Sequence, residues 1–131
     1  MVNNQTGLYG HWIYNEDFNP ADYYGFVYII TNITNNRKYI GKKNFSNMYY
    51  GSRHWLLYTG TQRELTNDIK ILGKHKFLFN IIKLCRTNEE LDKKEIEFQI
   101  YYNVLHSKLP NGDKEYYNRC IHKVGFNSSG I

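Results

Sequence analysis

A predicted β-hairpin over residues 25–43, GFVYIITNITNNRKYIGKK, constrains the fold of this chain more than any other stretch. Residues 26–31 are β-branched or aromatic, and the shorter run at 37–40 is followed by Gly41. Asn35 and Asn36 lie between the runs, and asparagine accepts a positive φ more readily than most residues. We therefore predict a two-residue type I′ turn at these asparagines.

This turn sets which residues of the hairpin lie opposite each other. It places Tyr28 opposite Lys43 and Ile30 opposite Gly41. Because strand side chains alternate with a period of two, Tyr28, Tyr39, Gly41 and Lys43 all fall on one face. Two phenols and an ammonium beside a glycine can form a phosphate-sized recess. The alternative is that the two tyrosines are ordinary half-buried packing residues.

The composition indicates one globular domain, since the chain has 131 residues, of which 41% are hydrophobic and 22% charged. No apolar run approaches the roughly 20 residues that span a bilayer. The first residues lack a secretory signal pattern, so we expect a cytoplasmic protein with no membrane partner. Cys85 and Cys120 form no metal-ligand pattern and are expected to be reduced thiols. The net charge of +5 is compatible with nucleic acid but is not specific for it.

The remaining elements are predicted from apolar spacing and end signals. Residues 62–72 read as a helix that ends at Gly73, and residues 77–85 read as a buried third strand. Residues 1–24 are predicted to be a loop-like arm with one short turn, and the last residues to be a frayed tail. The expected fold class is α+β, with a small three-stranded antiparallel sheet flanked by helices in the order β-β-α-β-α.

The best-signalled helix is predicted from about residue 88 to Leu105, with Thr87 as N-cap and Glu90 completing a capping box. Its apolar stripe consists of Leu91, Phe98, Tyr102 and Leu105. One carboxylate, Glu95, falls on this stripe, where a charge is costly unless a partner compensates for it. Glu97 lies about 200° around the helix from Glu95 and should be solvated.

Glu95 is therefore a candidate ligand for a divalent metal. One carboxylate together with waters and a substrate phosphate is typical of Mg²⁺. The alternative is a glutamate at the edge of the stripe that reaches solvent or pairs with a lysine.

Residues 42–61 interleave basic and aromatic side chains, a pattern that suits contact with a phosphate backbone and unstacked bases. The basic residues of this segment are Lys42, Lys43, Arg53 and His54. In the predicted register Lys42 points to the opposite sheet face. The alternative is a surface loop whose aromatic residues cover the core.

The hairpin resembles the signature of the GIY-YIG nucleases, with Phe26-Val27-Tyr28 as the first element and Tyr39-Ile40-Gly41 as the second. The resemblance is to small phage-type members, and it covers roughly residues 24–121. It implies a GIY-YIG-like fold, with an arm at 1–24, a nuclease domain at 25–121 and a tail at 122–131. It also implies that Glu95 binds metal, and Asn118 matches an asparagine near the end of the family's domain.

The arginine that the family carries shortly after the second element is absent at its usual offset. Arg53 is the nearest candidate, and Lys43 or Arg63 are possible substitutes that would also contact nucleic acid.

The resemblance implies a DNA endonuclease that depends on Mg²⁺ or Mn²⁺. Glu95 would hold the metal, and Tyr28 would act as general base, with its pKa lowered by Lys43. Tyr39 would orient water or phosphate, Arg53 would balance charge on the phosphate, and Asn118 would hold Tyr28 or the metal shell. The alternatives are a module of the same fold that binds DNA without cutting it, and an RNA-directed nuclease. Recognition of a long DNA site would require a partner, a homodimer or the 42–61 segment. The expected location is the cytoplasm, including that of a phage-infected host cell.

Overall fold

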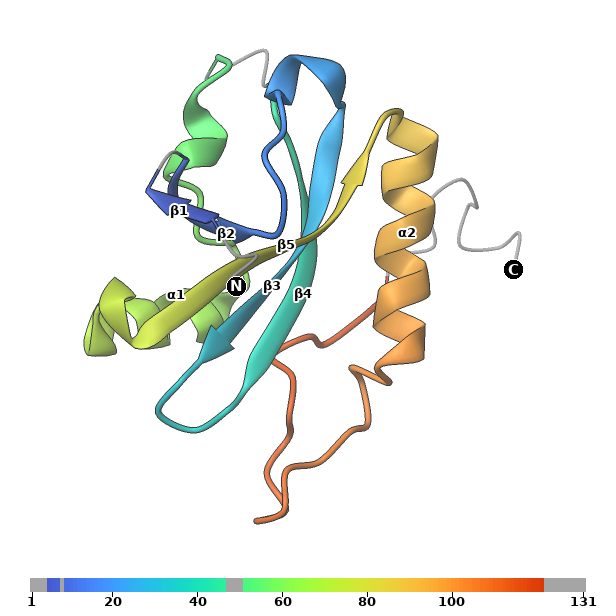
Figure 1. Cartoon of the computed structure of the whole chain (residues 1–131). Helices are drawn as coiled ribbons and strands as arrows, with labels where there is room; N and C mark the ends of the chain where they lie inside the picture. Colours follow the sequence, from blue (N-terminus) through green and yellow to red (C-terminus); the bar gives the residue numbers. More distant parts are fainter. Residues whose placement is uncertain (1–4, 8, 47–50, 122–131) are drawn as a thin grey trace.

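The computed structural model describes residues 5–7, 9–46 and 51–121, and the predicted tail at 122–131 lies outside these (Figure 1). In chain order the elements are β1 (Gln5–Gly7), β2 (Gly10–Tyr14), η1 (Pro20–Asp22), β3 (Gly25–Asn32), β4 (Lys38–Asn44), η2 (His54–Leu56), α1 (Arg63–Leu72), η3 (Lys74–Lys76), β5 (Phe77–Cys85) and α2 (Asn88–Tyr101), where η marks a short 3-10 helix.

The strands form one sheet in the order β1-β2-β5-β3-β4, of which the four from β2 to β4 are the mixed central part. β3 pairs antiparallel with both β4 and β5, and β2 pairs parallel with β5. The predicted α+β class is confirmed, and so is the order β-β-α-β-α for β3, β4, α1, β5 and α2. The sheet contains more strands than the three that the sequence predicted.

The extra strands lie in the segment that was predicted to be a loop-like arm, and that prediction is wrong for β1 and β2. Trp12, in the middle of β2, is fully buried, and its indole Nε1 donates a hydrogen bond to the carbonyl of Trp55 at 2.8 Å. The partner strand β5 follows β2 by more than 60 residues. A parallel pairing over such a separation leaves no local signal in the sequence.

The hairpin register differs from the predicted one by two residues. Tyr28 lies opposite Gly41, and Phe26 lies opposite Lys43. The turn is longer than a two-residue type I′ turn, because Asn36 has a positive φ of 65° and Asn35 does not. Asn32 begins the turn, and its backbone N–H donates to the carbonyl of Arg37 at 2.8 Å. A shift of two residues leaves every side chain on its predicted face.

The sheet separates two apolar cores. One face packs against η2 and α1, around Trp12, Tyr28, Trp55 and Leu65. The other face packs against α2 (Figure 1), around a cluster that includes Leu91. The Tyr28 side chain belongs to the first of these cores, whereas α2, which carries Glu95, packs against the second face.

The α2 helix begins as predicted but ends four residues earlier. The hydroxyl of Thr87 accepts from the backbone N–H of Glu90 at 3.0 Å, which confirms the N-cap. At the other end Asn103 has a φ of 54°, and the N–H of Val104 donates to the carbonyl of Gln99 at 3.1 Å. This pattern is a Schellman motif with asparagine in the left-handed position, which stops the helix at Tyr101.

Three smaller predictions are also settled. The α1 helix ends at Leu72, where Gly73 follows with a φ of 95°. Cys85 and Cys120 are both free thiols. In the part of the chain that the structure describes, no helix is long and apolar enough to cross a membrane.

Candidate active site

Three tyrosines cluster on the face of the sheet that packs against η2 and α1. Tyr28 on β3 and Tyr39 on β4 have ring centroids 6.2 Å apart, and Tyr58, which follows η2, lies 6.0 Å from Tyr28. The prediction that Tyr28, Tyr39, Gly41 and Lys43 share a face is consistent with the observed register. Tyr58, four residues after His54, joins the two hairpin tyrosines in this cluster.

Two glycines surround the hydroxyl of Tyr28. A Cβ on Gly41 would lie 2.5 Å from that oxygen, and a Cβ on Gly60 would lie 3.8 Å from it. Gly60 also has a φ of +90°, which a larger side chain rarely adopts. The absence of a side chain at Gly41 therefore lets the Tyr28 ring lie directly against the backbone of β4.

We predict that Gly41→Ala destabilises the fold by roughly 1–3 kcal/mol and displaces Tyr28, because the new methyl overlaps both the hydroxyl and the ring. Urea unfolding measures the stability. Gly112→Ala is the comparison, because Gly112 has a φ of +92° but open space around it. That variant reports backbone strain alone, and equal destabilisation of the two variants would contradict the steric explanation.

The pKa of Tyr28 is raised well above its usual value, which overturns the prediction that Lys43 lowers it. Burial is the main cause, because the side chain is only 1% exposed. Tyr58 and Tyr39 raise the pKa further, Tyr58 also through a hydrogen bond with Tyr28, and Glu95 adds a smaller effect. Tyr28 is therefore a neutral phenol at neutral pH.

Lys43 lies beside Tyr58 instead of Tyr28. Its Nζ is 2.9 Å from Nδ1 of His54 and 4.5 Å from the centre of the Tyr58 ring. Burial lowers the pKa of the Lys43 ammonium. The ammonium therefore places its charge over the face of the Tyr58 ring, and it links η2 to β4.

Glu95 is half-buried on the sheet-facing side of α2, and Glu97 is exposed, as predicted. Burial raises the pKa of Glu95 to about 7, with Lys42 lowering and Asp92 raising it to smaller extents. Lys42, whose charge lowers the pKa of Glu95, is itself paired with Asp92. Glu95 forms no ion pair with any residue that the structure describes. Its charge raises the pKa of both Tyr28 and Tyr39, so it lies within electrostatic reach of both phenols.

This donor set fits a hard divalent cation held by one carboxylate and completed by water and phosphate oxygens. Burial raises the pKa of Glu95 more than the charge of Lys42 lowers it, and a bound cation would favour the ionised carboxylate. Across the described ranges, no group of three or more His, Cys, Asp or Glu side chains gathers as a metal cage.

We predict that Glu95 makes the protein less stable as the pH rises. The folded-state pKa of about 7 exceeds the ordinary 4.5, so the folded state holds the proton more tightly than the unfolded state. Its contribution is complete below about pH 4.5 and is lost as the pH rises to about 7, a change of up to roughly 3 kcal/mol. The free energy of unfolding, measured in urea at pH 5 and pH 8, should depend less on pH in Glu95→Gln than in the wild type. An equal change between the two pH values in both proteins would contradict the prediction.

The side-chain amide of Asn118 holds the backbone of β4, and among the described residues it forms no hydrogen bond with Tyr28 or Glu95. Its Oδ1 accepts from the N–H of Ile40 at 3.1 Å, and its Nδ2 donates to the carbonyl of Ile40 at 2.9 Å. The buried Gln99 on α2 donates to the same carbonyl at 3.0 Å. The two side-chain amides thus hydrogen-bond the backbone N–H and carbonyl of Ile40, between Tyr39 and Gly41 on the outer edge of β4. The sequence did not predict this role for Gln99.

The predicted basic residues are not all brought to the tyrosine cluster. Arg53 is exposed at the start of η2 and lines a cavity of about 470 Å³ together with Trp55. Arg63 is exposed at the first position of α1. Only Lys43 and His54 contact the cluster.

Comparison with known proteins identifies the family of this chain. A family model described as "Putative endonuclease segE, GIY-YIG domain" matches residues 12–121. The chain is also 36% identical over 67 residues to the protein named "Putative endonuclease segE" of Enterobacteria phage T4. That match covers 51% of this chain and only 30% of the T4 protein, and no solved structure was found to match. Because the family model spans most of the chain, this protein belongs to the GIY-YIG family of the SegE endonucleases.

Proposed function

We propose that this protein is an endonuclease that hydrolyses phosphodiester bonds of DNA with the help of a divalent metal, Mg²⁺ or Mn²⁺. The single observation that carries the proposal is the electrostatic coupling of Glu95 on α2 to Tyr28 on β3 and Tyr39 on β4. Glu95 affects the pKa of both phenols although it follows them in the chain by more than 50 residues. Family membership supports the reaction class, and the T4 relative carries the name of an endonuclease.

Glu95 is the residue that would hold the metal, which supplies positive charge against the scissile phosphate when bound. A proton and a cation compete for the same carboxylate, and the pKa of about 7 places this competition at neutral pH. Cleavage should therefore increase as the pH rises through about 7.

Tyr28 would take the proton of the attacking water without becoming a lasting phenolate. The raised pKa argues against a standing negative charge on this buried phenol. As water attacks phosphorus, its proton passes to Tyr28, the proton of Tyr28 passes to Tyr58, and Tyr58 releases its own to solvent. The phosphorus–oxygen bond of the leaving group breaks, and that oxygen collects a proton from solvent. Tyr39 and Tyr58 are both partly exposed, so they form the solvent side of the cluster.

The remaining polar groups would bind or position the nucleic acid. Lys43 and His54 lie beside Tyr58 and would contact phosphates next to the cleaved bond. The exposed guanidinium groups of Arg53 and Arg63 would contact the backbone further away, and Arg53 stays the proposed source of the charge that the family's arginine supplies. Lys42 is a weaker candidate, because its ammonium is already paired with Asp92.

A plasmid assay tests the proposal. Supercoiled DNA incubated with the protein and Mg²⁺ should be nicked or linearised, and EDTA should prevent this. Labelled RNA of the same sequence, run in parallel, tests the RNA-directed reading. Intact plasmid in Mg²⁺ and in Mn²⁺, with folded protein, would refute the nuclease.

The burial of Tyr28 favours a second function, a module that grips DNA without cutting it. Its hydroxyl is bonded to Tyr58 and its side chain is 1% exposed, which is unusual for a group that must reach water. In that case the protein should shift labelled DNA in a gel with and without metal while the plasmid stays supercoiled.

A further inference from the structure

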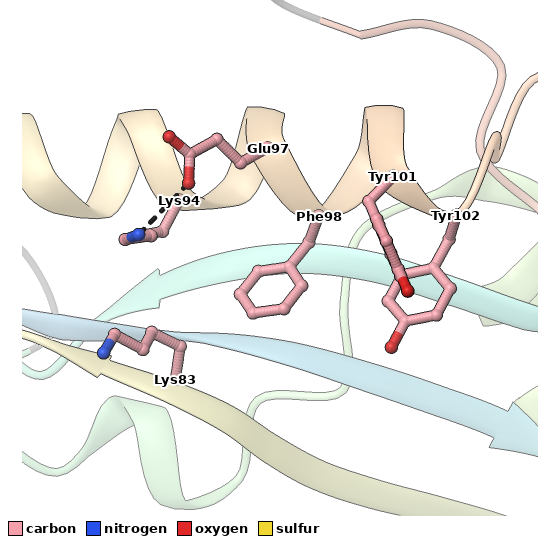
Figure 2. A pocket seen from close by; sticks show the side chains of 6 residues that line it. All are labelled: Lys83, Lys94, Glu97, Phe98, Tyr101 and Tyr102. Atoms are coloured by element: carbon pink, nitrogen blue, oxygen red, sulfur yellow. Dashed lines mark hydrogen bonds and ion pairs between the residues drawn. The ribbon is translucent and has the colours of Figure 1, made fainter.

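A groove between α2 and the end of β5 is not used by the proposed chemistry. It has a volume of about 470 Å³, and it is lined by Lys83, Lys94, Glu97, Phe98, Tyr101 and Tyr102 (Figure 2). Four of these residues come from α2, Tyr102 is the C-cap that directly follows it, and Lys83 comes from β5. We infer that this groove, here called the aromatic groove, binds an unpaired base and the adjacent phosphates of a nucleic-acid strand. The inference rests on the proposed function, because the strand would belong to the substrate.

The aromatic side chains form a corner suited to a flat ring. The ring planes of Phe98 and Tyr102 lie within 10° of each other, with centroids 6.4 Å apart. The ring of Tyr101 stands at 87° to that of Tyr102, with centroids 4.9 Å apart (Figure 2). A base can therefore stack on one surface while its edge rests against a second ring. Stacking of this kind suits any base, because every base has a π face.

The exposure of these rings supports binding over internal packing. Tyr101 is 78% exposed and Tyr102 is 42% exposed, so neither ring is needed to fill the core. Neighbouring exposed aromatic residues at the end of a helix indicate a ligand-binding surface.

The charge at the rim favours nucleic acid over an apolar protein segment. Lys83 is exposed and forms no ion pair with the residues that the structure describes. Lys94 pairs with Glu97 at 3.1 Å, so Lys83 leaves the rim with a net positive charge. A strand backbone supplies the complementary negative charge at regular spacing.

The groove lies near the proposed active site but on a different side of α2. Glu95 is about 100° further around the helix than Lys94, and Tyr101 is about 9 Å further along the axis than Glu95. A single strand spans this distance in roughly three nucleotides. The groove would therefore hold the substrate strand beyond the cleaved bond and not the reacting phosphate.

The test separates recognition of bases from recognition of phosphates. Binding of a labelled short oligothymidylate is measured in EDTA by fluorescence anisotropy, beside an abasic oligonucleotide of equal length and charge. The wild type should bind the thymidylate more tightly. Tyr101→Ala should remove most of this preference, by about fivefold in affinity, which corresponds to about 1 kcal/mol of stacking. Lys83→Ala should weaken both ligands equally, and oligouridylate tests whether DNA or RNA is the better ligand.

Two variants outside the groove are the controls. Tyr24→Ala removes another exposed tyrosine, and Lys70→Ala removes an exposed lysine of α1. Equal affinity of the wild type for thymidylate and abasic ligand would overturn the inference, as would an unchanged preference in Tyr101→Ala. Failure of the plasmid assay with an intact base preference would refute the nuclease but leave the groove as a binding site. Normal cleavage without any base preference would support the nuclease but refute the aromatic groove as a binding site.

Discussion

Replacing Glu95 with glutamine is expected to abolish metal-dependent cleavage and to leave the binding of DNA nearly unchanged. The amide is the same size as the carboxylate, but it carries no charge to hold a divalent cation. Glu95 is half-buried and has no ion-pair partner among the described residues, so a neutral side chain is also cheaper to bury there. The variant should therefore be folded, and at pH 8 it should be more stable than the wild type. Loss of activity together with a gain of stability would be hard to explain by misfolding.

The experiment combines the plasmid assay with a gel shift at several Mg²⁺ concentrations. Glu89→Gln is the matched control, because Glu89 is an exposed glutamate in the first turn of the same helix. That variant should cut DNA at the rate of the wild type. If Glu95→Gln retained full activity with Mg²⁺, the assignment of the metal ligand would be wrong.

Replacing Tyr28 with phenylalanine is expected to slow cleavage by about 10²–10⁴-fold, the usual cost of removing a group that transfers a proton. The ring, which fills the space above Gly41, is retained, and only the hydroxyl is lost. Stability should fall by roughly 1 kcal/mol, because Tyr58 loses its hydrogen-bond partner. Single-turnover cleavage at saturating protein measures the chemical step without the contribution of binding.

Tyr14→Phe is the matched control for this prediction. Tyr14 is buried in the same core, and its hydroxyl has no hydrogen-bond partner among the described residues. Removing that hydroxyl should be neutral or stabilising, and it should leave cleavage unchanged. Tyr58→Phe should slow cleavage in the same way as Tyr28→Phe if the two hydroxyls pass a proton between them. Unaltered cleavage in Tyr58→Phe would exclude the relay and leave Tyr28 to act through another acceptor.

The site also shows which functional residues local patterns can identify. Periodicity alone placed Glu95 on the core-facing stripe of α2, because a helix repeats every 3.6 residues. Alternation alone placed Tyr28, Tyr39 and Lys43 on one face of the hairpin, and this survived an error of two residues in the register. Gln99 gave the same signal and was overlooked, because it lies one turn after Glu95 on the buried side of α2. Tyr58 lies outside both the hairpin and the helical stripe, so neither pattern places it.

The sequence by itself determined the order β3-β4-α1-β5-α2, the N-cap of α2 and the faces of the main site residues, because these depend on neighbours a few residues apart. Only the tertiary structure decided the parallel pairing of β2 with β5, the anchoring of Ile40 by Asn118 and the raised pKa of Tyr28. Each of these depends on residues that are distant in the chain and close in space. Burial in particular is a property of the whole packed core, so no local pattern could show that Tyr28 is a neutral phenol.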